Sequence, residues 1–380
     1  MSEKKKIIFL TGTRADFGKL KPLIDKIHDS SSFESYIFAT GMHTLLKYGR
    51  TYEELEKRGY SNLFVYMNQT HTTDQDTILA NTITGFGNFV KEVKPDLIVI
   101  HGDRVETLAG SIVGSFNNIL VAHIEGGEIS GTIDEAIRHS VTKLSHIHFV
   151  SNDEAKNRLI QMGEMEEAIF VIGSPDIEIM LSSNLPTLAE TKQHYDIRFD
   201  KFSILIFHPV VTELDNLEDQ VKNLISAVLQ SKKNYIVIYP NNDEGTNIIL
   251  NQYEQLRNNS HFGLFPSIRF ENFLTLLKNS DFIIGNSSAG VREAEVFGIP
   301  AINIGSRQKN RNKNKEIINI GSDVDDILNS IKLCEDKKIT PSTYFGDGKN
   351  TSEKFLQTLL SDKIWSISLQ KQFVDLNSKN

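Results

Sequence analysis

The stretch DLIVIHGDRVETLAGSIVGSFNNILVAHIEGGEISGTIDEAIRHS, residues 96–140, decides the fold of this chain. It holds two apolar, β-branched runs, Leu97–Ile100 and Ile119–Val121, and between them Val105–Phe116, whose pattern predicts a helix. A strand, a helix and a second strand in this order predict neighbouring strands of a parallel sheet. We therefore expect an α/β fold, in which ligands bind outside the carboxyl ends of the strands.

Each of these two strands ends in a cluster of polar residues and glycines. Asp103 follows the first strand and Glu125 follows the second, so both carboxylates are expected at one edge of the sheet. Asp134 opens the next helix, and Arg138, four residues on, falls on the same helical face. With His123, these residues predict acid/base chemistry on a small molecule. The alternative is that Asp103 and Glu125 only cap helices and that Asp134 and Arg138 form a surface ion pair.

Composition sets limits on the class of protein. The 380 residues suggest two or three domains, and 39% hydrophobic with 24% charged residues is ordinary for a soluble globular protein. The formal net charge of −8 argues against a nucleic-acid partner. A single cysteine, Cys334, excludes an intramolecular disulfide. The apolar run after the N-terminal lysines is too short for a signal peptide, and no run suits a membrane span, so we expect a cytoplasmic protein.

The first strand of the chain, Lys6–Leu10, runs into a glycine-containing turn before a helix expected at Leu20–His28. This turn is neither a G-x-G-x-x-G motif nor a P-loop. Arg14 and Lys19 flank it, where an anion would also meet a helix N-terminus. They are either phosphate ligands or a solvated basic pair.

The second half of the chain repeats the α/β pattern after a hinge expected at Gly173–Pro175. Its clearest motif is GNSSAGVREA, residues 285–294, in which small residues at a strand-to-helix turn could offer backbone N–H groups and hydroxyls to a diphosphate. Glu293 could accept hydrogen bonds from ribose hydroxyls, and the alternative is a tight loop with a serine cap. His208 and Arg307 follow strands and are either anion donors or structural residues.

These motifs, taken together and in order, resemble the hydrolysing UDP-N-acetylglucosamine 2-epimerases of the bacterial sialic acid pathway. The resemblance rests on TGTRADFGKLKPL (11–23), HGDR (101–104), HIEGGEISGTIDEAIRH (123–139), GSPD (173–176), YPNNDEG (239–245) and GNSSAGVREA (285–294). It implies two Rossmann-like domains in a GT-B-like arrangement, with the active site in the interdomain cleft. The implied domains are residues 1–174 and 175–359, with a C-terminal helix in residues 360–380, at Ile367–Leu376, that packs on the first domain. Family members form dimers or tetramers, so a homodimer or homotetramer is expected.

The resemblance implies conversion of UDP-N-acetylglucosamine and water to UDP and N-acetylmannosamine through 2-acetamidoglucal. Asp103, Glu125 and Asp134 match the catalytic acids, without an assignment to either step, and Arg138 and His123 would support them. Neither a metal nor another cofactor is implied. The positions matched to binding of UDP and the substrate are Arg14, Gly18, Lys19, Arg104, His208, Asn241, Ile268, Phe270, Ser287, Ser288, Gly290, Glu293 and Arg307.

Three other functions stay open at this point. Enzymes that act on UDP-N,N'-diacetylbacillosamine, in the legionaminic acid pathway, share several of these motifs. A GT-B glycosyltransferase would share the fold, and a nucleotide-sugar sensor would share the binding residues without needing the acids. Asp134 and Ala289 stand where the non-hydrolysing relatives have glutamate and glycine, which favours the hydrolysing branch.

Overall fold

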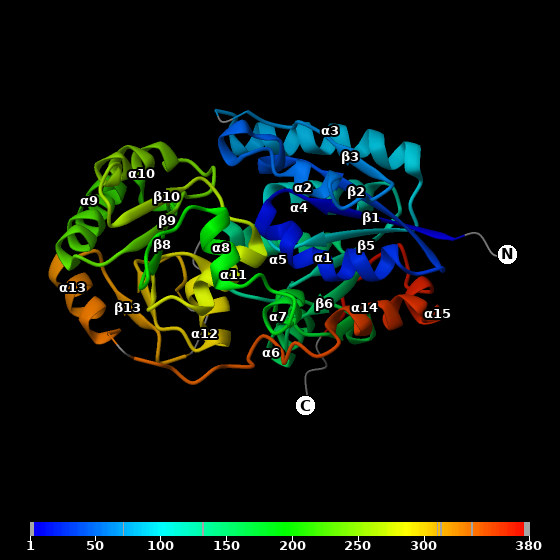
Figure 1. Cartoon of the computed structure of the whole chain (residues 1–380). Coiled ribbons are helices and arrows are strands. Elements are labelled where there is room, and N and C mark those ends of the chain that lie inside the picture. The colour runs from blue at the N-terminus through cyan, green and yellow to red at the C-terminus, as the bar shows by residue number, and fades with distance from the viewer. Residues whose placement is uncertain are drawn as a thin grey trace. The chain divides into compact units, whose positions relative to one another are not determined.

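The computed structural model describes residues 4–70, 72–130, 133–309, 311, 314–335 and 337–375. The chain forms two compact units (Figure 1). The first unit runs to Glu128, resumes over Asp134–Leu181 and takes the chain again from Tyr344, while the second unit holds Ile129–Ile133 and Ser182–Thr343. The chain therefore leaves the first unit after Leu181 instead of at Gly173–Pro175, because the helix that follows this tripeptide packs against the first helix of the chain.

The first unit is built on a seven-stranded parallel sheet with the strand order β3-β2-β1-β4-β5-β6-β7. The order reverses between β1 and β4, and such a switch point opens a crevice at the carboxyl ends of the strands. Residues that follow β1, β4 and β5 are thereby brought together. The strands are β1 Lys5–Thr11, β2 Phe33–Ala39, β3 Leu63–Val65, β4 Leu97–His101, β5 Leu120–Ile124, β6 Ile147–Val150 and β7 Ile169–Val171.

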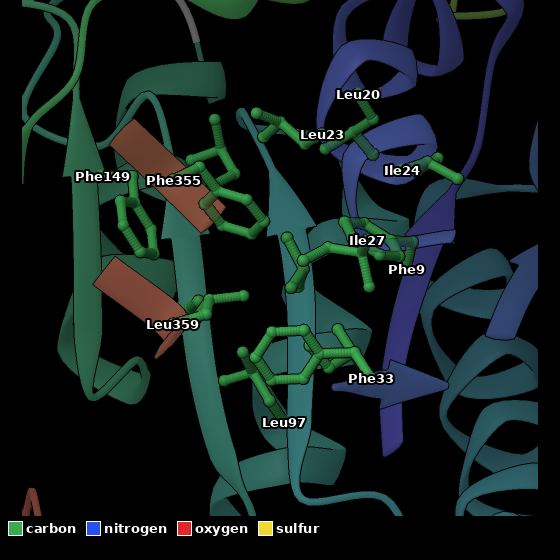
Figure 2. Packing of buried hydrophobic residues seen from close by; sticks show 14 of the residues in the cluster. Phe9, Leu20, Leu23, Ile24, Ile27, Phe33, Leu97, Phe149, Phe355 and Leu359 are labelled. Atoms are coloured by element: carbon green, nitrogen blue, oxygen red, sulfur yellow. The ribbon is translucent and has the colours of Figure 1, made fainter. Parts of the chain in front are cut away.

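Helices cover both faces of this sheet. This is expected because successive side chains of β1 point to opposite faces and are apolar on both. Ile7 and Phe9 share a core cluster with α1 and α14, whereas Ile8 and Leu10 share the other cluster with α3 and α4. Figure 2 shows the first cluster, in which Phe355 of α14 lies against Phe149 with 4.8 Å between the ring centroids. The helices of this unit are α1 Arg14–His28, α2 Tyr52–Glu56, α3 Gln75–Val93, α4 Val105–Phe116, α5 Ile133–Leu144, α6 Asp153–Gln161, α7 Pro175–Met180, α14 Thr351–Leu360 and α15 Asp362–Trp365.

The second unit repeats the layout on a six-stranded parallel sheet with the order β10-β9-β8-β11-β12-β13. Its switch point lies between β8 and β11, and its core cluster joins these strands to α9, α10 and α13. The strands are β8 Ser203–Ile206, β9 Tyr235–Ile238, β10 Phe262–Phe265, β11 Ile283–Gly285, β12 Ala301–Ile304 and β13 Ile318–Ile320. The helices are α8 Leu188–His194, α9 Leu214–Ser231, α10 Thr246–Tyr253, α11 Phe270–Lys278, α12 Glu293–Phe297 and α13 Val324–Leu333.

Two sequence predictions are wrong in their local structure. Helix α1 begins at Arg14 and not at Leu20, because Thr13 caps it by accepting a hydrogen bond from the Asp16 N–H. No helix occupies the described residues 367–375, where one was expected; Leu376 lies outside the described residues. The segment is instead held by hydrogen bonds to earlier parts of the first unit; for example, the Val374 N–H donates to the Gly163 carbonyl at 3.0 Å.

The part of the chain that the structure describes contains no helix with the length and apolar character of a membrane span.

We predict that Phe355→Ala lowers the free energy of unfolding by about 3–5 kcal/mol, because it leaves a cavity beneath α14. Phe355 is fully buried and also faces Phe9. Phe116→Ala is the matched control, since that ring is 79% exposed and its loss should cost under about 0.5 kcal/mol. Urea denaturation followed by tryptophan fluorescence measures both, and equal stabilities for the two variants would contradict the prediction.

Candidate active site

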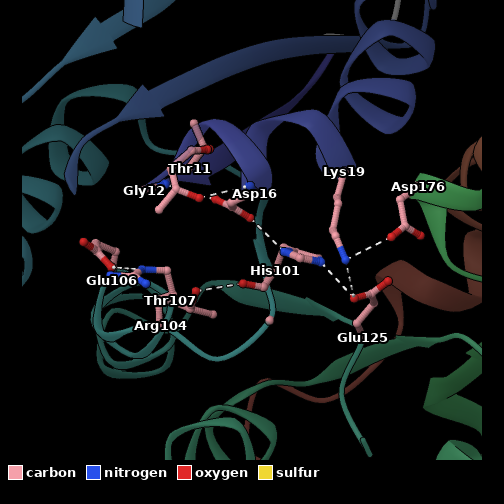
Figure 3. A network of polar contacts seen from close by, with 12 residues as sticks. Thr11, Gly12, Asp16, Lys19, His101, Arg104, Glu106, Thr107, Glu125 and Asp176 are labelled. Carbon is pink, nitrogen blue, oxygen red and sulfur yellow. Dashed lines mark hydrogen bonds and ion pairs between the residues drawn. The ribbon is translucent and has the colours of Figure 1, made fainter. Parts of the chain in front are cut away.

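The site in the first unit is built where β1 and β4 end side by side. Asp16 lies in the first turn of α1, and its Oδ2 accepts a hydrogen bond from the Gly12 N–H at 3.0 Å. Its other oxygen, Oδ1, lies 2.8 Å from Nδ1 of His101, the last residue of β4. Figure 3 shows this contact and the chain of polar contacts that continues from it.

Glu125 directly follows β5 and stands on the far side of His101. Its Oε2 is 3.1 Å from His101 Nε2 and 4.0 Å from Lys19 Nζ, and Ser174 Oγ donates to its Oε1. The backbone adopts a left-handed conformation with φ of 63°, and the side chain is almost completely buried. These contacts join Glu125 to side chains of three other segments of the first unit.

The two carboxylates beside His101 favour the protonated form of its imidazole. Burial alone would lower the pKa of its imidazole, but the hydrogen bonds and charges of Asp16 and Glu125 raise that pKa to about 9. The imidazolium thus links two carboxylates that would otherwise repel each other.

Asp103 is held by a different cation. It forms an ion pair with Arg138 of α5, which also donates to the Glu128 carbonyl at 3.1 Å. Burial would lower the pKa of Arg138, but the nearby carboxylates, Asp103 first among them, raise it. The interpretation of Arg138 as part of a surface ion pair is wrong, since its side chain is 1% exposed. Asp134 lies in the first turn of the same helix, is half-buried, and contributes to the charge that Arg138 experiences.

His123, on β5, is completely buried behind these residues. Its Nε2 is 2.8 Å from the Gly102 carbonyl and its Nδ1 is 3.3 Å from Thr142 Oγ1. Burial lowers the pKa of its imidazole to about 3, so the ring is neutral and can donate to the carbonyl. His123 therefore supports the loop that carries Asp103 instead of acting as an acid.

Each cation that was expected to meet a phosphate in this unit has a carboxylate partner. Arg14 pairs with Glu54, and Arg104 Nε lies 3.5 Å from Oε2 of the buried Glu106. Lys19 Nζ is 2.9 Å from Oδ2 of Asp176, a fully buried acid in α7 (Figure 3). Gly18 is buried in α1, one residue before Lys19. A bound phosphate would have to share these cations with the carboxylates.

In the second unit, the ends of β8 and β11 are tied together by Asn286. Its Oδ1 accepts from the His208 N–H at 2.7 Å, and its Nδ2 donates to the His208 carbonyl at 2.8 Å. The imidazole Nδ1 of His208 accepts from the Asn241 N–H at 3.1 Å. The neutral ring therefore carries its proton on Nε2, which makes that atom a hydrogen-bond donor.

The loop after β11 has the tight turn that its sequence predicts. Gly285 has φ of 131°, and a Cβ there would lie 1.9 Å from the Ile206 carbonyl oxygen, so only glycine fits. Ser287 accepts from the Ala289 N–H, and Arg307 donates to the Asn286 carbonyl at 3.3 Å. The other residues expected around the nucleotide are Ser288 and Gly290, which bound a single 3-10 turn, and Glu293, which is buried at the start of α12.

Ile268 and Phe270, expected near the uracil, are 7% and 5% exposed. Phe270 is the first residue of α11, and the Arg269 N–H between them donates to the Tyr195 hydroxyl at 2.8 Å. The side chains of Ile268 and Phe270 are therefore largely enclosed by the protein and offer little surface to a uracil ring.

Sequence reasoning missed four polar residues of the first unit: Asp16, Glu106, Ser174 and Asp176. His101 was expected at a strand end with the HGDR motif, but without a role of its own. Ser174 had a signal in its position shortly after a strand. The three acids lie in α1, α4 and α7 and had no such signal.

Among the described residues, no group of three or more histidine, cysteine, aspartate or glutamate side chains is arranged to hold a metal ion.

Comparison with known proteins identifies relatives along nearly the whole chain. The "UDP-N-acetylglucosamine 2-epimerase" of Neisseria meningitidis serogroup B is 44% identical over 376 residues, which cover 98% of this chain and 100% of the relative. The "UDP-N,N'-diacetylbacillosamine 2-epimerase (hydrolyzing)" of Legionella pneumophila is 35% identical over 373 residues, with 97% and 98% covered.

Solved structures confirm the fold class of two Rossmann-like domains in a GT-B-like fold. The UDP-GlcNAc 2-epimerase of Methanocaldococcus jannaschii, crystallised with UDP-GlcNAc and UDP, superposes with a TM-score of 0.79 at 23% identity and covers 93% of this chain and 99% of its own. The profile of the family described as UDP-N-acetylglucosamine 2-epimerase matches residues 25–360. The resemblance seen in the sequence is thereby confirmed: the chain belongs to the UDP-N-acetylglucosamine 2-epimerase family.

Proposed function

We propose that this protein converts UDP-N-acetylglucosamine and water to UDP and N-acetylmannosamine, as the first step of sialic acid biosynthesis. One observation carries the proposal: two buried or half-buried acids, Asp103 and Glu125, stand at the ends of adjacent strands, each held by its own cation. Two independently charged carboxylates suit a reaction that removes a proton from one face of a sugar and returns one to the other.

The first step would be an elimination. A carboxylate accepts the proton on C2, the electron pair of that C–H bond forms the C1–C2 double bond, and the C1–O bond breaks with its pair leaving on UDP. The C2 proton is weakly acidic, so we expect cleavage of the C1–O bond to run ahead and give the sugar oxocarbenium character. A nearby carboxylate stabilises that positive charge.

The second step would hydrate the enzyme-bound 2-acetamidoglucal. An acid gives a proton to C2 on the opposite face, and a water molecule adds its oxygen to C1 and loses a proton to the protein or solvent. The product is N-acetylmannosamine, inverted at C2. Asp134 would join Asp103 and Glu125 in these transfers, and Arg138 would hold Asp103 in place.

The second unit would bind the uridine nucleotide. The Nε2–H of His208 and the hydroxyls of Ser287 and Ser288 suit the diphosphate, and Glu293 suits the ribose hydroxyls. In the first unit Arg14, Lys19 and Arg104 would assist departure of the diphosphate after exchanging their carboxylate partners.

The choice of substrate follows the relatives. The Neisseria meningitidis relative, named for UDP-N-acetylglucosamine, is 44% identical, against 35% for the Legionella pneumophila relative named for UDP-N,N'-diacetylbacillosamine. The bacillosamine derivative is therefore the second candidate. The word "hydrolyzing" in the name of the second relative, with Asp134 and Ala289 in this chain, supports hydrolysis over simple epimerisation. The same proposal includes a cytoplasmic location and assembly into a homodimer or homotetramer. Light scattering, which measures the molar mass in solution, tests the assembly.

Proton NMR of the protein with UDP-N-acetylglucosamine in deuterated water tests this function. We expect UDP and N-acetylmannosamine that carries deuterium at C2, because the C2 proton exchanges with solvent between the steps. UDP-N-acetylmannosamine as the end product would overturn hydrolysis. No turnover here, with turnover of UDP-N,N'-diacetylbacillosamine, would establish the second candidate instead.

We predict that Asp103→Asn and Glu125→Gln each lower kcat by about 10²-fold or more, because an amide cannot exchange a proton. The Kd for UDP, measured by calorimetry, should stay within about threefold, a change of under 1 kcal/mol. Glu92→Gln, an exposed change on α3, is the control and should leave both values unaltered. Undiminished turnover in both site variants would indicate a protein that binds nucleotide sugars without using these acids.

A further inference from the structure

Each ring nitrogen of His101 lies within hydrogen-bond distance of a carboxylate. Nδ1 lies 2.8 Å from Asp16 Oδ1, and Nε2 lies 3.1 Å from Glu125 Oε2 (Figure 3). A carboxylate only accepts hydrogen bonds, and a neutral imidazole donates from one nitrogen only. Two such contacts therefore require one more proton than a neutral imidazole and two carboxylates contain, and the imidazole is its natural place.

The charges around His101 also favour the protonated form of its ring. Three acids belong to this network: Asp16 contacts His101, while Glu125 and Asp176 contact Lys19. A protonated His101 brings this group to a charge of −1, while a neutral ring would leave −2 in a largely buried place. Asp16 from α1 and Glu125 from the end of β5 contact His101 directly, and the charge of His101 also acts on His123 of β5. Lys19 from α1 lies on the other side of Glu125, and Asp176 from α7 pairs with that lysine.

The ring is held firmly on both sides. Asp16 is fixed by the Gly12 N–H and by its own N–H to Thr13 Oγ1, and the His101 carbonyl accepts from Thr107 Oγ1 at 2.8 Å. The side chain of His101 is 10% exposed, so solvent screens its charge only weakly. Such a preorganised cation can set both the orientation and the charge of the acid beside it.

We propose that His101 is a positioning residue: clamped by Asp16 as an imidazolium, it keeps the Glu125 carboxylate ionised and aimed for proton transfer. The inference rests on the proposed function, because it needs Glu125 to exchange a proton with the substrate. Ser174 completes the arrangement by donating to the other oxygen of Glu125.

The test is the pH profile of kcat for His101→Gln, which keeps a neutral donor near Glu125 and removes the charge. Without the imidazolium the pKa of the Glu125 carboxyl should rise, because two acids then stand near it with one lysine. We expect the acid limb to move upward by about one pH unit or more, so that at pH values on that limb the loss of kcat exceeds the loss on the plateau by roughly tenfold.

The wild-type profile has a second signature. The raised pKa of His101, about 9, means that its charge is present below that pH and is lost above it. Wild-type kcat should therefore fall as pH rises through about 9, and His101→Gln should lack this limb. A variant profile that is lowered equally at every pH would show a merely structural role and overturn the proposal.

A second measurement follows the protonation of His101 directly and needs no substrate. With ¹⁵N-labelled histidine, both ring nitrogens of His101 should be protonated at neutral pH, and Asp16→Asn should lower the titration midpoint. One deprotonated nitrogen in the wild type would overturn the proposal even if the reaction is as proposed. Conversely, no turnover by the wild type would remove the proposed function and leave this result intact. His28→Gln, an exposed change at the far end of α1, is the control and should alter neither measurement.

Discussion

The acids at the strand ends must stay charged while they are shielded from water, and most of the site meets this requirement. An isolated buried carboxylate would take up a proton, because desolvation penalises the charged form. Each acid is instead matched with a cation of another element: Asp103 with Arg138, Glu125 with His101, and Asp176 with Lys19. These pairs tie α1, α5 and α7 to the edge of the sheet, so the chemistry and the local structure depend on the same contacts.

The two kinds of cation differ in what they permit. Arg138 stays charged at every accessible pH, so Asp103 has a constant partner. His101 can lose its proton, which makes the environment of Glu125 dependent on pH. Two neighbouring carboxylates with different partners need not titrate alike, and a reaction with one proton removed and another returned can use that difference.

Much of this could be predicted from the sequence. The buried strands, the polar residues directly after them and the glycine turn at 285–290 follow local rules, and they placed Asp103, Glu125 and the second-unit loop correctly at strand ends. The partners could not be predicted, because pairing between residues far apart depends on how elements pack. Asp16 and His101 are 85 residues apart, and Glu125 and Ser174 are 49 apart. Lys19 was expected to be either a phosphate ligand or a solvated base, and its partner Asp176 in α7 could not be predicted because it is distant in sequence.

The first unit is discontinuous, and this has a consequence for how the protein is made. Phe355 and Leu359, near the end of the chain, fill the same core as Phe9 and Leu97 near its beginning. On the ribosome, the first sheet must therefore wait, with the part of one face that α14 covers still open, until the stretch Ser182–Thr343 has been synthesised. The second unit takes almost all of its residues from Ser182–Thr343, so most of it can fold as soon as this stretch emerges. The half of the protein that begins the chain is thus the last to be completed, and its exposed apolar face is what chaperones would meet in the interval.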